Sequence, residues 1–226
     1  MNTELKPTRP HSKKLTAIIT ALVIITITIA CIFVAMYSQS TLIFSEDFED
    51  PDRNQQYLTR HAFTIEQNRL RIKIEASFSG CDVALPNQFD DFTFITSLFP
   101  VGDTADGSAN LLFRYSDSGW YEIQFRPNQK QVNVIKVIKE GEEENRRLLT
   151  EGWVDIPKIT FKPTANELKL TANGNTFTLW FNGEQILALA DTDEVIHTQG
   201  TINVGAGAGE TGGIAYEYDN IRVWKP

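Results

Sequence analysis

The 226-residue sequence contains only two cysteines, Cys31 and Cys81, and they lie far apart. Cys31 falls in an apolar segment near the N-terminus, so Cys81 has no partner for an intramolecular disulfide in the rest of the chain. After residue 41 the chain also lacks an Asn-x-Ser/Thr glycosylation sequence. The remaining residues, about 185, must therefore be held together by a hydrophobic core, and that length is sufficient for one.

Positive charge is also scarce. The chain has 21 Lys and Arg against 29 Asp and Glu, which gives a net charge of −8. The first 41 residues hold four of those basic residues and one acidic residue, so residues 42–226 carry about −11. Such an acidic domain is a poor match for a phosphate backbone, and we exclude nucleic acid as a partner.

One long hydrophobic run is present, at residues 15–37, and it contains no charged residue. Its 23 residues are enough to cross about 30 Å of hydrocarbon as a helix. Four basic residues precede the run and an acidic segment, residues 46–50, follows it. The positive-inside bias therefore predicts a cytoplasmic tail (1–14), a transmembrane helix (15–37) and an extracytoplasmic domain (38–226) of a single-pass cell-membrane protein.

Two other interpretations of this run stay open. A cleaved secretory signal has a shorter apolar region, of about 7–15 residues, although Ser38-Gln39-Ser40 offers small residues for a peptidase. A lipoprotein would be cleaved before Cys31, but the apolar Ile32-Phe33-Val34 after it fits that processing poorly. A buried core helix is disfavoured because the run is apolar on all sides.

The rest of the chain shows short runs with alternating polarity and no amphipathic helix. Asn173-Gly174, Asn182-Gly183 and Gln67-Asn68 each separate two such runs and favour two-residue hairpin turns. The expected strands are 42–48, 63–66, 70–76, 81–85, 92–99, 109–115, 120–126, 131–138, 168–172, 176–181, 184–190, 200–205 and 214–224. This pattern predicts a single all-β domain, an antiparallel sandwich.

Two segments interrupt the pattern. Residues 139–152 are crowded with charge, which predicts a solvated loop between strands. Residues 205–213 are rich in glycine but lack the Lys-Ser/Thr of a phosphate-binding loop. We expect them to allow bulges and to form the loop between the last two strands.

Several spaced elements resemble the concanavalin A-like lectin/glucanase superfamily. These are IFSEDFED, ANLLFRYSDSGWYEIQF, NELKLTANGNTFTLWFNGEQI and GTINVGAGAGETGGIAYEYDNIRVWKP. Within the superfamily, the sequence is similar to laminin G-like domains and to domains of the 3-keto-disaccharide hydrolase type. The resemblance implies a jelly roll of two curved sheets, with the first and last strands side by side and the ligand on the concave sheet or its rim.

Strands 109–115 and 120–126 carry the candidate binding residues. Alternation assigns to the core Leu111, Phe113, Tyr115, Tyr121, Ile123 and Phe125. The opposite face would present Asn110, Leu112, Arg114, Trp120, Glu122 and Gln124. An aromatic plane beside planar polar groups suits a sugar. The resemblance to the hydrolase type points to Arg114, Glu122 and Gln124, and Trp180 is a further candidate; the alternative is an exposed face with Arg–Glu pairing across strands.

Catalysis has less support. The glucanase branch uses a Glu-x-Asp-x-x-Glu strand, which sets two carboxylates across a glycosidic bond, and this sequence has none. His61 and His197 are isolated, so neither a zinc pair nor a triad is indicated.

The resemblance also implies a structural Ca²⁺ where the terminal strands meet. Asp219, in YEYDNIRVW, matches the ligand position, and Glu46, Asp47 or Glu49 could complete the shell. The alternative is that Asp219 accepts backbone N–H groups and caps a loop.

The function predicted from the sequence is a membrane-anchored, extracytoplasmic binding module, with carbohydrate as the favoured ligand and a surface protein as another. The alternatives are a glycoside-processing hydrolase of the 3-keto-disaccharide type and a structural or accessory surface protein.

Overall fold

The computed structural model describes residues 40–102, 104, 106–157, 159–162 and 164–226. Thr41–Pro226 forms one compact unit. The apolar run at 15–37 lies outside the described residues, and so do the cleavage sites weighed for it. Within the described part, no helix combines the length and apolarity needed to cross a membrane.

Strands make up nearly all of the regular structure, as the alternating pattern predicts. A single turn of helix, α2 (Pro51–Asn54), follows the first strand, and Asp50 caps it by accepting from the backbone N–H of Asp52. The strands are β1 (Thr41–Glu46), β2 (Phe63–Glu66), β3 (Arg69–Ile74), β4 (Gly80–Phe89), β5 (Phe92–Val101), β6 (Gly107–Ser116), β7 (Gly119–Arg126), β8 (Gln131–Glu140), β9 (Glu143–Leu148), β10 (Val154–Asp155), β11 (Asn166–Asn173), β12 (Thr176–Phe181), β13 (Glu184–Ala190), β14 (Gly200–Ala208) and β15 (Ile214–Lys225).

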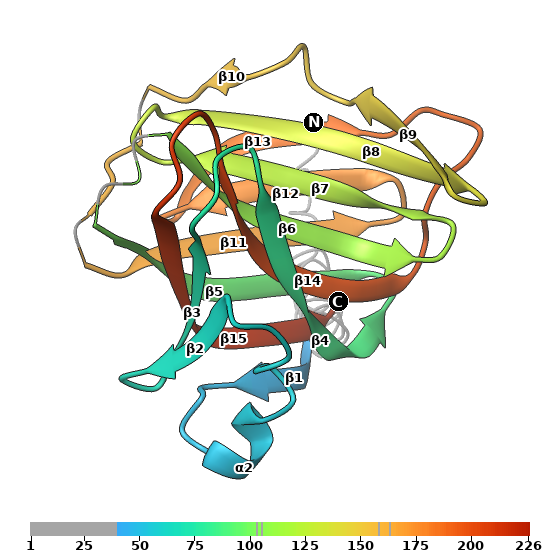
Figure 1. The fold of residues 1–226 in the computed structure, drawn as a ribbon. Coiled ribbons are helices and arrows are strands. Elements are labelled where there is room, and N and C mark those ends of the chain that lie inside the picture. Colours follow the sequence, from blue (N-terminus) through green and yellow to red (C-terminus); the bar gives the residue numbers. More distant parts are fainter. Residues whose placement is uncertain (1–39, 103, 105, 158, 163) are drawn as a thin grey trace, which may run out of the picture. The chain divides into compact units, whose positions relative to one another are not determined.

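The strands form two antiparallel sheets that face each other (Figure 1). The 8-stranded sheet runs β13-β12-β11-β5-β15-β3-β2, with β1 added on β15. The 7-stranded sheet runs β10-β8-β7-β6-β14-β4, with β9 added on β8. Because β1 pairs with β15, the expectation that the first and last strands lie side by side is confirmed.

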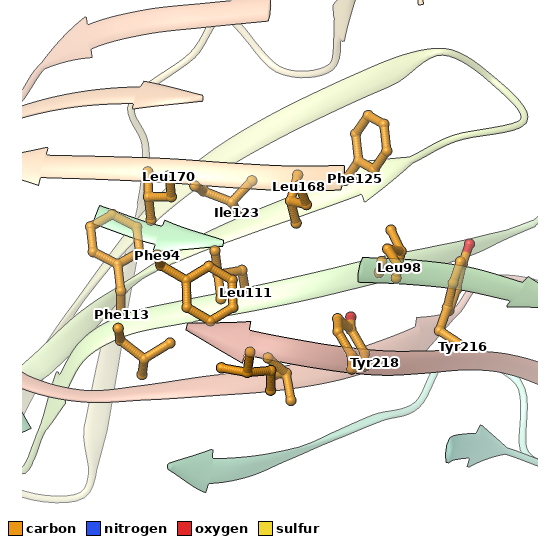
Figure 2. Packing of buried hydrophobic residues seen from close by; sticks show 14 of the residues in the cluster. Phe94, Leu98, Leu111, Phe113, Ile123, Phe125, Leu168, Leu170, Tyr216 and Tyr218 are labelled. Carbon is orange, nitrogen blue, oxygen red and sulfur yellow. The ribbon is translucent and has the colours of Figure 1, made fainter. Parts of the chain in front are cut away.

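The core lies between the sheets, and alternate residues of each strand supply it. Figure 2 shows side chains of β6 and β7, such as Phe113 and Ile123, meeting side chains of β5 and β11, such as Phe94 and Leu170. Tyr218 lies in this core and donates its hydroxyl hydrogen to the carbonyl oxygen of Gly205, at 2.6 Å. This bond links the two sheets without leaving a polar group unpaired.

The predicted turns are present. Gln67 and Asn68 both have positive φ, at 53° and 57°, as a type I′ hairpin turn requires. Asn182 and Gly183 do the same between β12 and β13. At the third turn Asn173 is still paired in the ladder with Thr176, so that turn begins one residue later than predicted.

Two expectations about the irregular segments need correction. Residues 139–152 do not form a loop throughout, because β9 occupies the middle of this range and pairs with β8. The glycine-rich segment is also strand at its start, since β14 continues to Ala208. In both places the strand lacks alternating apolar and polar side chains, which is the pattern that predicts a strand from the sequence.

Candidate functional site

A hollow of about 480 Å³ opens on the face of the 7-stranded sheet that points away from the core. Its lining residues come from β4, β6, β7, β9 and β14, from the turn before β4, and from the residues just before β6 and just after β14. They are Phe78, Ser79, Gly80, Cys81, Asp82, Asp106, Ser108, Asn110, Leu112, Trp120, Glu122, Gln124, Arg126, Arg146, Gly207, Ala208 and Gly209. This is the face on which the sequence placed a binding site.

Glycine opens the floor of the hollow. Gly80 of β4 and Gly207 of β14 lie opposite each other in the ladder and both line the hollow. A Cβ on Gly207 would stand 3.0 Å from the Ser108 hydroxyl oxygen and 3.2 Å from Asn110 Nδ2. Backbone therefore forms the floor here, and neighbouring side chains of β6 occupy the space above it.

Glu122 is the central carboxylate and is only 5 % exposed. Arg146 of β9 donates from Nη2 to Glu122 Oε2 at 2.6 Å, and Gln124 donates from Nε2 to Oε1 at 2.8 Å. Both partners line the hollow as well. The result is a planar, charge-assisted array of acid, base and amide on its wall.

Trp120 lies at one end of the hollow but presents little of its ring. The indole stacks on Tyr115, with centroids 4.7 Å apart, and it packs with Leu112, Ile135 and Val137 in a small apolar cluster. Only 6 % of the residue is exposed. Trp120 therefore does not offer the free aromatic plane that the sequence reading assigned to it.

Three buried polar atoms of the lining residues have no hydrogen-bond partner within the described part of the chain. They are Asn110 Oδ1, Trp120 Nε1 and Arg126 Nε. Buried polar groups are normally hydrogen-bonded, so each exception needs an explanation, such as strain or a bound water, ion or ligand. These atoms come from β6 and from both ends of β7, and they comprise one acceptor and two donors.

Two further carboxylates of the hollow are engaged. Asp82 accepts from Asn203 Nδ2 at 2.7 Å, and Asp106 accepts from the backbone N–H of Thr211 at 3.0 Å. Burial, with Asp82 adding to the effect, raises the pKa of the Cys81 thiol to about 11. A raised pKa favours the protonated thiol near neutral pH, which makes Cys81 a poor nucleophile.

Arg114 does not lie on this face, and the expectation that it does is wrong. A β-bulge shifts the register between Phe113 and Ser116, and Arg114 itself has φ of 52°. The extra residue reverses the alternation, so Arg114 turns inward and Tyr115, predicted to be core, packs against Trp120.

Arg114 is fully buried at the end of the sandwich. Its guanidinium donates to the carbonyl oxygens of Asp90, Gly174 and His197 and to the Asp91 carboxylate. Burial lowers the pKa of Arg114, and the charge of Asp91 opposes that shift. Arg114 thus ties three loops together instead of facing a ligand.

The remaining candidates lie elsewhere. Trp180 is on β12 of the other sheet, where Lys169 Nζ stands 4.5 Å from its ring centroid. Of the binding residues named from the sequence, the hollow brings together Asn110, Trp120, Glu122 and Gln124.

The proposed calcium ligands lie near β1 and β15, away from the hollow. Glu46 is buried and accepts from Arg53 Nη2 at 3.0 Å and from the Tyr57 hydroxyl at 2.9 Å. Asp219 accepts from Asn220, and burial followed by the charges of Asp47 and Glu49 raises its pKa. Among the described residues, no group of three or more His, Cys, Asp or Glu forms a metal cage.

Sequence reasoning missed Phe78, Asp82, Arg126 and Arg146, which also line the hollow. Arg126 continues the parity of Trp120, Glu122 and Gln124 along β7, so extending the pattern by one residue pair would have found it. The others come from the turn before β4, from β4 itself and from β9, and no local pattern relates them to β7.

No protein-family model matches the sequence, and no curated protein matches it either. Solved structures do match. A protein of unknown function with a galectin-like fold from Bacillus subtilis aligns with a TM-score of 0.63 at 12 % identity, covering 81 % of this chain and 96 % of that one. The fold is a galectin-like jelly roll. The jelly roll that the sequence analysis predicted is thus confirmed as the fold.

Two other similar structures are of proteins that bind or act on carbohydrate. The carbohydrate-binding module CBM66 from Bacillus subtilis aligns with a TM-score of 0.55 at 13 % identity, over 72 % of this chain and 91 % of that one. A κ-carrageenase from Pseudoalteromonas carrageenovora, in complex with an oligotetrasaccharide of κ-carrageenan, aligns with a TM-score of 0.56 at 8 % identity, over 82 % and 95 %. Jelly rolls of this kind thus include both binding modules and glycoside hydrolases.

Proposed function

We propose that the jelly roll is a carbohydrate-binding module whose ligand occupies the hollow over β4, β14, β6 and β7. The observation that carries the proposal is the set of three buried, unpartnered polar atoms on Asn110, Trp120 and Arg126. Sugar hydroxyls both donate and accept hydrogen bonds, so one saccharide can satisfy an acceptor and two donors together. The neighbours that bind or process carbohydrate support the same class of ligand.

Binding is favoured over glycoside hydrolysis by the state of the carboxylates. A glycosidase needs two carboxyl groups that flank the scissile bond, one of them able to give up or take up a proton. Here Glu122 is held by Arg146, Asp82 by Asn203, and Asp106 by the backbone of Thr211. A reducing-end assay on every glycan that binds would detect the enzymatic alternative.

The first test is a glycan array probed with the full chain in mild detergent. We expect specific binding, and we expect Asn110→Ala to weaken it about tenfold, because a ligand hydroxyl loses its acceptor. Since Asn110 Oδ1 bonds to nothing in the described chain, the melting temperature should barely change. Asn87→Ala, an exposed residue of β4 outside the hollow, is the matched control.

An array with no specific binder would refute the proposal. The proposal would also be refuted if every glycan that binds had the same affinity for the wild type and for Asn110→Ala.

We further propose that residues 15–37 anchor the module in the cell membrane with the jelly roll outside. The length of the apolar run and the basic residues before it support this orientation. In membranes from expressing cells, the full chain should resist extraction by alkaline carbonate, and its C-terminus should be digested by protease added outside. Release by carbonate, or a mature chain that begins after residue 38, would instead support cleavage.

A further inference from the structure

The turn before β4 carries a second feature of the hollow, and its interpretation rests on the proposed function. Phe78 lines the hollow and is 79 % exposed, the most exposed of the large apolar side chains in the described chain. An aromatic ring left in water beside a polar hollow has no role in the core. A flat apolar surface next to hydrogen-bonding groups is, however, what the C–H face of a sugar ring needs.

The turn that holds Phe78 is fixed in place. The backbone N–H of Phe78 donates to the carbonyl oxygen of Gly209 at 2.7 Å, and that of Ala208 donates to Ser79 at 2.8 Å. A Cβ on Gly212 would come within 1.8 Å of the Glu75 carbonyl oxygen, so the turn packs tightly on the segment after β14. Phe78 is therefore presented by a rigid support, which reduces the entropy lost when a ligand binds.

Phe78 also adopts a strained backbone conformation. Its φ is 50°, a value that few residues other than glycine and asparagine adopt. Strain of this kind persists where the surrounding structure imposes it, and it is concentrated at functional sites. The backbone N–H of the same residue is held by Gly209.

The aromatic residue predicted from the sequence cannot take this role. Tyr115 covers one face of the Trp120 ring, and the apolar cluster buries most of the rest. Trp120 lines the hollow, and its indole N–H is buried and has no hydrogen-bond partner in the described chain.

We infer that Phe78 is the stacking platform of the hollow, that Trp120 acts through its N–H alone, and that the ligand is a neutral saccharide. The sugar lies with its C–H face on Phe78, and its hydroxyls bond to Trp120 Nε1 and Asn110 Oδ1. The charges of the hollow favour a neutral ligand, because Glu122 pairs with Arg146. Among the described lining residues, the carboxylates of Asp82 and Asp106 then outweigh the one remaining cation, Arg126, which disfavours an acidic glycan.

Isothermal titration of the full chain tests the three parts separately. The neutral probes are the tetraoses of cellulose, laminarin, mannan and xylan, and the acidic probes are tetragalacturonate and a sulfated carrageenan tetrasaccharide. We expect a neutral probe to bind, Phe78→Ala to weaken its affinity at least about tenfold, and Phe78→Tyr to preserve it. Phe78→Leu, which keeps apolar area but loses the plane, should behave like Phe78→Ala.

Trp120→Phe keeps a ring in the apolar cluster and removes only the N–H donor. Its affinity should fall about three- to tenfold, with a melting temperature within a few degrees of wild type. Leu42→Ala, which truncates an exposed apolar residue of β1 outside the hollow, should bind like wild type.

Failure of this inference is distinguishable from failure of the proposed function. If neither class of probe binds, the proposed function fails. If a probe binds and Asn110→Ala weakens it while Phe78→Ala or Trp120→Phe does not, the function stands and the assigned roles are wrong. If only the acidic probes bind, the neutral ligand is wrong.

Discussion

Arg114 is a single buried cation that links three loops. It is fully buried, and its guanidinium reaches a carboxylate and three backbone carbonyls from three separate loops. Asp91 also accepts from the backbone N–H of Gly174, so the ion pair and the β11–β12 turn depend on each other. Removing one partner of such a network is costly because the other groups stay buried and unsatisfied.

We expect Arg114→Lys to reduce the free energy of unfolding by about 3–5 kcal/mol, because an ammonium group cannot span the planar fork. Urea denaturation followed by tryptophan fluorescence measures this. Arg60→Lys, an exposed arginine with the same change in chemistry, is the control and should stay within about 0.5 kcal/mol of wild type. Equal stabilities for the two variants would contradict the structural role of Arg114.

The alternation of β6 and β7 predicted which residues of these two strands line the hollow, up to the bulge in β6. Asn110, Glu122 and Gln124 were placed on the correct face because both strands alternate regularly up to Phe113. The error begins at the bulge, which one sequence does not reveal, since arginine carries no turn signal and the residues around it are ordinary strand formers. The same error moved Tyr115 from the small apolar cluster to the core.

At the scale of the element, β9 connects the hollow to the opposite side of the β8–β9 hairpin. Its neighbouring residues Arg146 and Arg147 point in different directions: the first pairs with Glu122 in the hollow, the second with Asp193 in the loop after β13. Asp193 also accepts from the buried Lys136 at 3.2 Å. The strand is therefore held by ion pairs on both faces, with no buried apolar side chain of its own.

These two arginines form a matched pair for mutation. Arg146→Gln removes the cation from Glu122, whose side chain is 7 % exposed, and should cost about 1–2 kcal/mol of stability and weaken glycan binding. Arg147→Gln breaks a pair in which the arginine is 63 % exposed, so its effect should be well below 1 kcal/mol with unchanged binding. Urea denaturation and titration with a bound glycan compare them, and the reverse order of effects would be a contradiction.

Strand β9 could not be predicted from the sequence, for a physical reason. Every residue of the strand is exposed, so it carries no alternation between core and solvent. A run of glutamate and arginine is also typical of a solvated loop. Only its pairing with β8 makes it a strand, and that pairing is tertiary information.

For the molecule as a whole, the junction of β1 and β15 brings several carboxylates close to Asp219. Burial and the nearby charges of Asp47 and Glu49 raise the pKa of Asp219, so its ionised form is disfavoured in the folded state. Above that raised pKa the charge lowers stability, and the penalty is relieved as the pH falls through it. A bound cation would relieve the same penalty at neutral pH.

We therefore propose that millimolar Ca²⁺ raises the melting temperature at pH 7 relative to EDTA, by a few degrees, and that Asp219→Asn abolishes the rise. In EDTA, Asp219→Asn should melt slightly above wild type, since it removes the disfavoured charge. Differential scanning calorimetry measures both. Equal melting temperatures in Ca²⁺ and EDTA would argue against an ion at this junction.

The architecture was largely predictable, because hairpin turns and period-two patterns are local signals. Thirteen runs chosen from the sequence correspond to strands, including the terminal pair. The hollow was not predictable in full. It needs β4, β7, β9 and the turn at Phe78 to converge, and their distances in the sequence give no indication that they do.

The glycines that line the hollow are different residues from those that pack in the core, so one surface can change in evolution without the other. Gly80 and Gly207 face the hollow, while their neighbour Ala206 faces the core. A change from glycine to alanine or serine at Gly207 would make the hollow shallower and crowd Ser108, yet it would leave the packing between the sheets intact. Under the proposed function, a single substitution at Gly207 would therefore alter the shape of the ligand site without altering the core.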